Sequence, residues 1–164
     1  MHHELLQLLQ ATEAVVDPSH WHPERYVLFH QLQVFNNARA ETDDRALHAA
    51  ALLHDVGKAV GFRGHAATGA DLLDGLVAPR VVWLVRHHLD LLTQPRATCR
   101  RLRGTQALRD LRALRRWDLA GRRPGATVVE PECALDMLLD GGGAALLDPA
   151  AGPPAPMHHD EESR

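Results

Sequence analysis

Apolar residues recur at helical spacing along most of the chain, which indicates helices rather than strands. No segment alternates apolar and polar residues over enough length for a sheet, and the nearest approach to a strand, residues 127–129, is short. The pattern therefore predicts an all-α fold, a single-domain bundle of about six or seven helices over residues 1–140. Beyond it, a Gly-Gly-Gly run, a Pro-Pro pair and a polar end predict a flexible, low-complexity tail over residues 141–164.

Proline, glycine and capping residues divide this pattern into separate helices. Asp17-Pro18 ends the first helix, Pro23 suits the first turn of the second, and the 42–44 segment suits the N-cap region of the third. Pro95 is expected to break the chain between the fifth and sixth helices. The expected helices span residues 4–16, 23–40, 42–58, 65–76, 79–91, 105–120 and 131–140.

The composition predicts a soluble, cytoplasmic protein with an aliphatic core. Of its 164 residues, 45% are hydrophobic but only 4% are aromatic, and Leu and Ala are abundant. Cys99 and Cys133 are the only cysteines, which fits free thiols in a reducing compartment. No apolar run approaches the roughly 18 residues that a membrane-spanning helix needs, and the acidic start is unlike a signal peptide. We therefore expect no membrane attachment.

Basic residues concentrate in one segment, although the net charge of the chain is only −3. Between residues 96 and 123 the only acidic residues are Asp110 and Asp118. This asymmetry indicates either an anionic partner, such as nucleic acid, or a solvated helix face. The arginines of this segment are Arg96, Arg100, Arg101, Arg103, Arg109, Arg112, Arg115, Arg116, Arg122 and Arg123.

The histidines are unusually many, twelve in all, and one of them forms a His-Asp pair in an apolar context. The dipeptide alone means little, because about one is expected by chance and the tail holds another, His159-Asp160. His54, however, lies on an apolar stripe, four residues after Ala50 and seven after Leu47. A polar pair at a buried helix end costs free energy unless it is paired or binds a metal.

The same positional test selects one residue from each of four further helices: His30, His65, His88 and Asp118. A single inward histidine is more often an ordinary core residue, but five inward groups, two of them involving carboxylates, favour a site. Imidazole and carboxylate ligands together suit Mn, Fe, Co, Ni or Zn, whereas Mg prefers oxygen. Histidines expected to have no ligand role are His2, His3, His20, His22, His48, His158 and His159.

The segment from Ala51 to Lys58, with the sequence ALLHDVGK, resembles the signature of the HD-domain phosphohydrolase superfamily. His30 lies 24 residues before His54, and the segments Gly64-His65, Arg86-His87-His88 and Trp117-Asp118 follow in order. This order is most similar to the HD domain of bacterial CCA-adding tRNA nucleotidyltransferases, over roughly residues 23 to 125. The chain has no room for the nucleotidyltransferase head, so the resemblance does not imply tRNA end-building.

The resemblance implies a main metal site made of His30, His54, Asp55 and Asp118. His65, with His88 or His87, matches the histidines that hold a second ion in some members. The cofactor is expected to be one or two divalent ions, Mn, Co, Ni, Fe, Zn or Mg. Related domains hydrolyse phosphomonoesters and 2′,3′-cyclic phosphates of nucleotides or RNA ends.

Roles follow for individual residues. We expect Asp55, with His54, to bind metal and to orient the attacking water or accept its proton. Lys58 either contacts the substrate phosphate or is a solvated lysine at a helix end. Arg86, His65 and His88 are predicted to bind substrate. The alternative function is a non-catalytic module that binds nucleotide or nucleic acid through the arginine-rich segment and keeps a structural metal.

Overall fold

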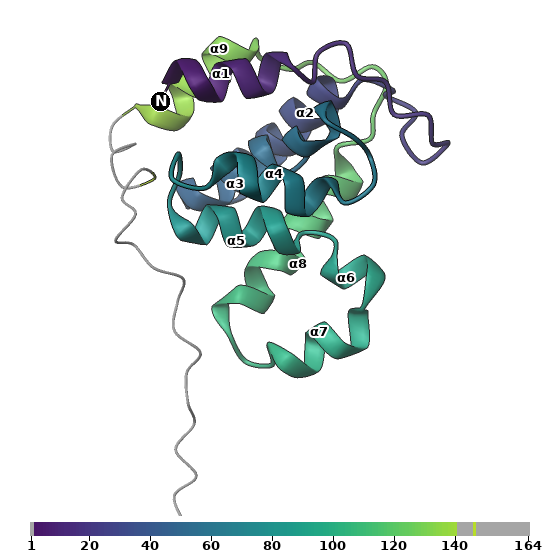
Figure 1. The fold of residues 1–164 in the computed structure, drawn as a ribbon, viewed down its shortest axis with the longest axis vertical. Helices are drawn as coiled ribbons and strands as arrows, with labels where there is room; N and C mark the ends of the chain where they lie inside the picture. Colours follow the sequence, from purple (N-terminus) through teal and green to yellow (C-terminus); the bar gives the residue numbers. More distant parts are fainter. Residues whose placement is uncertain (1, 141–145, 147–164) are drawn as a thin grey trace, which may run out of the picture.

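The computed structural model of the chain describes residues 2–140 and residue 146, and within them every regular element is helical (Figure 1). This confirms the predicted all-α fold. The predicted tail over residues 141–164 lies outside the described residues, apart from Leu146. The elements are α1 (His2–Gln10), α2 (Val27–Glu41), α3 (Arg45–Leu53), the 3₁₀ helix η1 (Val56–Ala59), α4 (His65–Leu73), α5 (Pro79–His87), α6 (Asp90–Thr93), α7 (Pro95–Arg101), α8 (Gln106–Ala120) and α9 (Pro131–Leu139).

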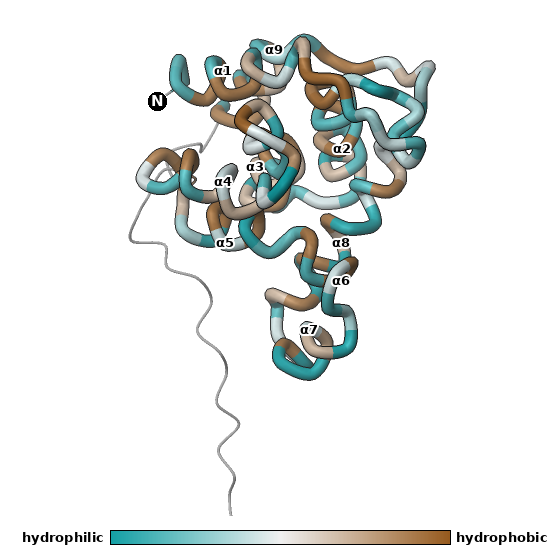
Figure 2. Tube along the Cα trace, turned by 45° about the vertical axis from the view of Figure 1, so that its right-hand side comes forward, coloured by the Kyte–Doolittle hydropathy of each residue, from teal (hydrophilic) through white to brown (hydrophobic). Residues whose placement is uncertain are grey.

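Helices α2, α3, α4, α5 and α8 surround an aliphatic core, in which side chains such as Leu52, Leu84 and Leu111 are almost fully buried. Helices α1 and α9 lie side by side at one end, and the Gln10 amide donates to the Glu132 carboxylate across them. Helices α6 and α7 project at the other end, and Figure 2 shows hydrophilic residues on the outer edge of this projection. Among the described residues, no helix is long and apolar enough to cross a membrane.

Local capping explains several boundaries. The Asp44 side chain accepts from two backbone N–H groups in the first turn of α3, and Thr105 caps α8 in the same way. Pro95 does not simply break the chain, as the sequence suggested, because it begins the short helix α7. Proline suits that position because the first backbone N–H of a helix has no intrahelical partner.

The third helix ends earlier than expected, at Leu53 instead of residue 58. Asp55 has φ −107° and ψ 7°, outside the α-helical range, and a 3₁₀ turn follows it. In a continuous α-helix adjacent side chains point about 100° apart. Leaving the helix at this point allows the adjacent His54 and Asp55 side chains to meet at one centre.

The second helix begins at Val27, not at Pro23, because the preceding residues form a closed loop. An isolated antiparallel bridge joins Val16 to Tyr26, and the Asp17 N–H donates to the Arg25 carbonyl at 2.7 Å. Arg25 adopts a φ of 68°, which is rare outside glycine. We call residues 17–25 the 17–25 loop; it carries buried polar side chains into the site described below.

The packing of η1 against α4 depends on Gly57. A Cβ atom there would overlap the His65 carbonyl oxygen and lie 2.7 Å from the Gly69 nitrogen. These are backbone atoms that no side-chain rotation can move. The glycine thus permits the close backbone approach that brings Asp55 beside His65.

Candidate metal centre

Four imidazole rings, from four different helices or helix ends, surround the carboxylate of Asp55. Its Oδ2 atom lies 3.4 Å from Nε2 of His54 and 3.9 Å from Nε2 of His30. Its Oδ1 atom lies 3.1 Å from Nε2 of His65 and 3.7 Å from Nε2 of His88. All five side chains are buried or nearly so. The structure therefore brings together residues that lie as far apart in sequence as His30 and His88.

Each of the four rings turns its Nδ1 atom toward a backbone carbonyl oxygen and its Nε2 atom toward Asp55. Because a carbonyl can only accept, Nδ1 of each ring donates to it, and Nε2 is the ring atom that faces Asp55. The Nε2 atoms of His30 and His54 are buried without a hydrogen-bond partner, as suits metal ligands. The Nδ1-to-oxygen distances are 3.0 Å for His30 to Gly121, 2.9 Å for His54 to Ala51, 2.8 Å for His65 to Phe62 and 2.7 Å for His88 to Val85.

Asp118, from α8, completes the centre on one side. Its Oδ1 atom lies 3.2 Å from Nε2 of His30, and two guanidinium groups hold its carboxylate. Arg115 donates to Oδ2 at 2.7 Å, and Arg122 donates to Oδ1 at 3.2 Å. The Oδ2 side of Asp55 thus faces His30 and His54, and Asp118 lies beside this side through its contact with His30.

Fewer side chains lie around the Oδ1 atom of Asp55. Around its Oδ1 atom lie His65 and His88, whose Nε2 atoms are 3.3 Å apart. Potential ligand atoms of His30, His54 and Asp55 lie within 4.8 Å of one another, and so do those of Asp55, His65 and His88. One ion would therefore be held by His30, His54 and Asp55, and His65 and His88 would be available, with Asp55, for a second.

The charges differ between the two sides. Burial alone would lower the pKa of His30, but its contacts with Asp118 and Glu24 outweigh burial and raise that pKa to about 9. On the other side, burial and the nearby His54 lower the pKa of His88 to about 4. Although burial favours its neutral form, Asp55 keeps a pKa well below its usual range because His54, His65 and Lys58 surround it. The carboxylate of Asp55 is therefore ionised and suited to bind a cation.

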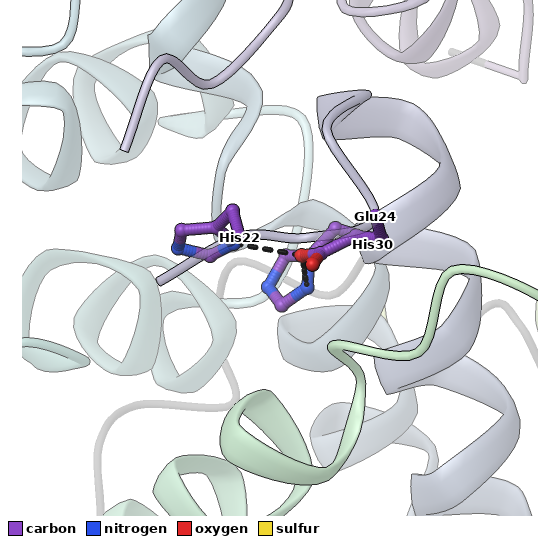
Figure 3. A group of neighbouring side chains, drawn as sticks. All are labelled: His22, Glu24 and His30. Carbon is purple, nitrogen blue, oxygen red and sulfur yellow. Dashed lines mark hydrogen bonds and ion pairs between the residues drawn. The ribbon is translucent and has the colours of Figure 1, made fainter. Parts of the chain in front are cut away.

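Glu24 and His22, in the 17–25 loop, support His30 from behind (Figure 3). Oε1 of Glu24 lies 2.9 Å from Nδ1 of His30 and 2.7 Å from Nδ1 of His22. A carboxylate on the outer nitrogen of a metal-binding histidine orients the ring and strengthens it as a ligand. Glu24 is not among the residues predicted from the sequence, and His22 was expected to be exposed or to support a ligand without being one. Helical spacing could not reveal them, because they lie in a loop that only tertiary contacts close.

Lys58 lies inside the cluster and is not a solvated residue. Its Nζ atom is 2.8 Å from Oδ2 of Asp55 and 3.0 Å from Oδ2 of Asp17, and the residue is 7% exposed. These two carboxylates outweigh the effect of burial and raise the pKa of Lys58. The lysine therefore carries its charge beside Asp55.

Two of the residues considered for the site lie outside the cluster. His87 binds Asp90 at 2.9 Å and its ring packs on Trp83, so His88 is the residue of this pair that faces the centre. Arg86 is exposed and pairs with Asp71, away from the cluster. The guanidinium groups that do reach the centre belong to Arg115 and Arg122. The Nε2 atom of His48 lies 2.7 Å from the Thr42 carbonyl oxygen, so this ring is engaged in a local contact.

A family model described as "HD domain" matches residues 27–120, which is more than half of the chain. The matched stretch includes all six groups that face the centre: His30, His54, Asp55, His65, His88 and Asp118. The 17–25 loop, with His22 and Glu24, precedes it.

Proposed function

Because the chain belongs to the HD-domain family, whose members are generally metal-dependent hydrolases, we propose that it is a phosphohydrolase. Its substrate is a phosphomonoester or a 2′,3′-cyclic phosphate of a nucleotide or RNA end. Water supplies the oxygen of the new bond to phosphorus, and the ester oxygen leaves. The observation that carries the proposal is the ring of four histidine Nε2 atoms around one ionised carboxylate.

The cation is held by His30, His54, Asp55 and Asp118, with His65 and His88 available for a second ion. When bound, it polarises a phosphoryl oxygen and lowers the pKa of the attacking water. The predominance of imidazole favours Mn, Fe, Co, Ni or Zn over Mg.

The chain's own residues supply position and charge. Asp55 is held ionised between the two histidine pairs, so it orients groups bound at both sides. Lys58 and the two guanidinium groups of Arg115 and Arg122 place positive charge around the centre. This charge favours a phosphate group, with Lys58 as a point charge and the arginines as planar donors.

The test is turnover of 2′-, 3′-, 5′- and 2′,3′-cyclic nucleotides, with p-nitrophenyl phosphate and its bis ester, in the presence of Mn, Co, Ni or Mg. Metal analysis of the purified protein accompanies it. We expect turnover that His54→Ala removes and that His48→Ala, a histidine outside the cluster, leaves intact. Absence of turnover with every metal would overturn the proposal. Nucleotide binding without turnover would instead favour a non-catalytic module with a structural metal.

A further inference from the structure

The arginine-rich segment divides into arginines that serve the fold and arginines that face outward. Arg116 pairs with Glu41, and Arg101 pairs with Asp90 at 2.9 Å. By contrast, Arg96 and Arg100 of α7 are exposed and have no side-chain partner among the described residues. They lie four residues apart and therefore on one face of α7.

The acidic residues of the same segment face inward. Asp110 is 2% exposed and binds Arg80 at 2.8 Å, and Asp118 belongs to the metal centre. The segment therefore presents no carboxylate of its own on its outer surface. Its outward charge is entirely positive.

The exposed arginines are connected to the metal centre by α8. Arg115, which binds Asp118 at 2.7 Å, lies three residues after Arg112 and thus on the same face of α8. The Arg112 guanidinium lies 3.9 Å from the Sγ atom of Cys99, the residue before Arg100 on α7. We call Arg96, Arg100, Arg112 and Arg115 the basic track.

A second connection leads from the other side of the centre to α7. His88 is followed two residues later by Asp90, which binds Arg101 of α7 at 2.9 Å. Helix α7 therefore contacts α6, which follows His88 closely in the chain, and these two helices form the projection seen in Figure 1.

The basic track is longer than one phosphate group requires. From Arg112 to Asp118 the helix rises about 9 Å, and α7 extends the track further. We propose that the substrate is the end of an oligonucleotide, and that the basic track binds the phosphates that follow the reacting one. This inference rests on the proposed function, in which the metal centre hydrolyses a phosphate ester. A reacting phosphate ester that is followed by further phosphates is the end of a phosphodiester chain. The inference narrows the substrate from nucleotides in general to the ends of oligonucleotides.

The first test measures binding without turnover. A fluorescein-labelled single-stranded RNA octamer is titrated in EDTA at several salt concentrations and followed by anisotropy. The double variant R96Q/R100Q should weaken binding roughly two- to thirtyfold. It should also reduce the slope of log K against log salt by about 1.4, as two lost single-strand phosphate contacts require. The matched control R39Q/R116Q removes two exposed arginines outside the track and should keep the slope.

The second test measures turnover. The ratio of kcat/KM for an octamer with a terminal phosphate to that for the matching mononucleotide should fall in R96Q/R100Q and not in R39Q/R116Q. The proposed role of the basic track would be overturned if R96Q/R100Q left both the kcat/KM ratio and the salt slope unchanged. Equal losses in the control R39Q/R116Q would overturn it as well. Absence of turnover for both substrates would count against the proposed function. The anisotropy titration would still show whether the basic track binds RNA. If polyglutamate displaces the RNA as well as unlabelled RNA does, the surface suits an acidic polypeptide and the RNA assignment is wrong.

Discussion

The two oxygens of the Asp55 carboxylate face environments that differ in ligand number, charge and support. On the Oδ2 side lie the imidazoles of His30 and His54, Asp118 contacts His30, and further side chains hold these groups from outside. On the Oδ1 side, only His65 and His88 converge, and their Nε2 atoms lie 3.3 Å from each other.

This difference indicates an order of cation binding. The Oδ2 side has a second carboxylate nearby, that of Asp118 beside His30, while around the Oδ1 atom the described residues supply two imidazoles. Glu24 supports His30 through Nδ1, whereas backbone carbonyls hold Nδ1 of His65 and His88. Because charge and outer support both strengthen metal ligands, we expect the first and tighter ion on the Oδ2 side.

The largest effect is expected from Asp55→Ala, which removes the group common to both sides. Cation binding and turnover should fall to background, while the far-ultraviolet circular dichroism spectrum keeps its helical shape. Removal of a buried charge also leaves Lys58 with one fewer partner, so Asp55→Asn serves as a second variant of similar size. Retention of cation binding in both variants would contradict the central place of Asp55.

The comparison between the two sides is tested most directly by single histidine variants. His54→Ala should remove the tight ion and turnover, whereas His65→Ala and His88→Ala should affect turnover much less if one ion is bound. The measurement is metal content and kcat for each variant. Equal damage from all three would show that the site holds two ions or that His65 and His88 contact the substrate.

A smaller effect is expected from Glu24→Gln, which keeps the shape of the side chain but removes the charge behind His30. Affinity for the tight ion should fall roughly 10- to 100-fold, the usual cost of losing such a supporting group. The visible spectrum of the Co(II)-loaded protein should change as well, since the ring of His30 is held less firmly. His22→Ala, which removes the other partner of Glu24, is expected to act in the same direction and more weakly.

The last prediction changes no residue and concerns the pH dependence of cation binding on the Oδ2 side. His30 has a pKa of about 9 in the metal-free protein, so it is protonated at neutral pH and a cation must displace that proton. Affinity should therefore rise about tenfold per pH unit below 9, with about one proton released per ion. Calorimetric titration in buffers of different ionisation enthalpy counts the protons. No proton release at pH 7 to 8 would contradict the charged state of His30.

Much of the fold followed from local features of the sequence. Apolar periodicity located most of the helices, and the N-cap residues Asp44 and Thr105 marked the starts of two of them to within a few residues. Other boundaries were wrong: the first helix ends at Gln10 instead of residue 16, and the fifth at His87 instead of residue 91. Two of the wrong boundaries are set by contacts with the buried centre. The second helix starts late because residues 17–25 bind the buried centre, and the third stops early because His54 and Asp55 both turn toward it.

The sequence by itself determined which face of each helix each candidate ligand occupies, because helical periodicity is a local property. Only the tertiary structure decided which groups meet across helices. In the folded chain His88, and not His87, faces the centre. Arg115 and Arg122 bind Asp118 there, while Arg86 pairs with Asp71. Glu24 lies behind His30. These contacts depend on how packed helices and a closed loop orient side chains that are distant in sequence. Spacing along the chain does not predict that orientation.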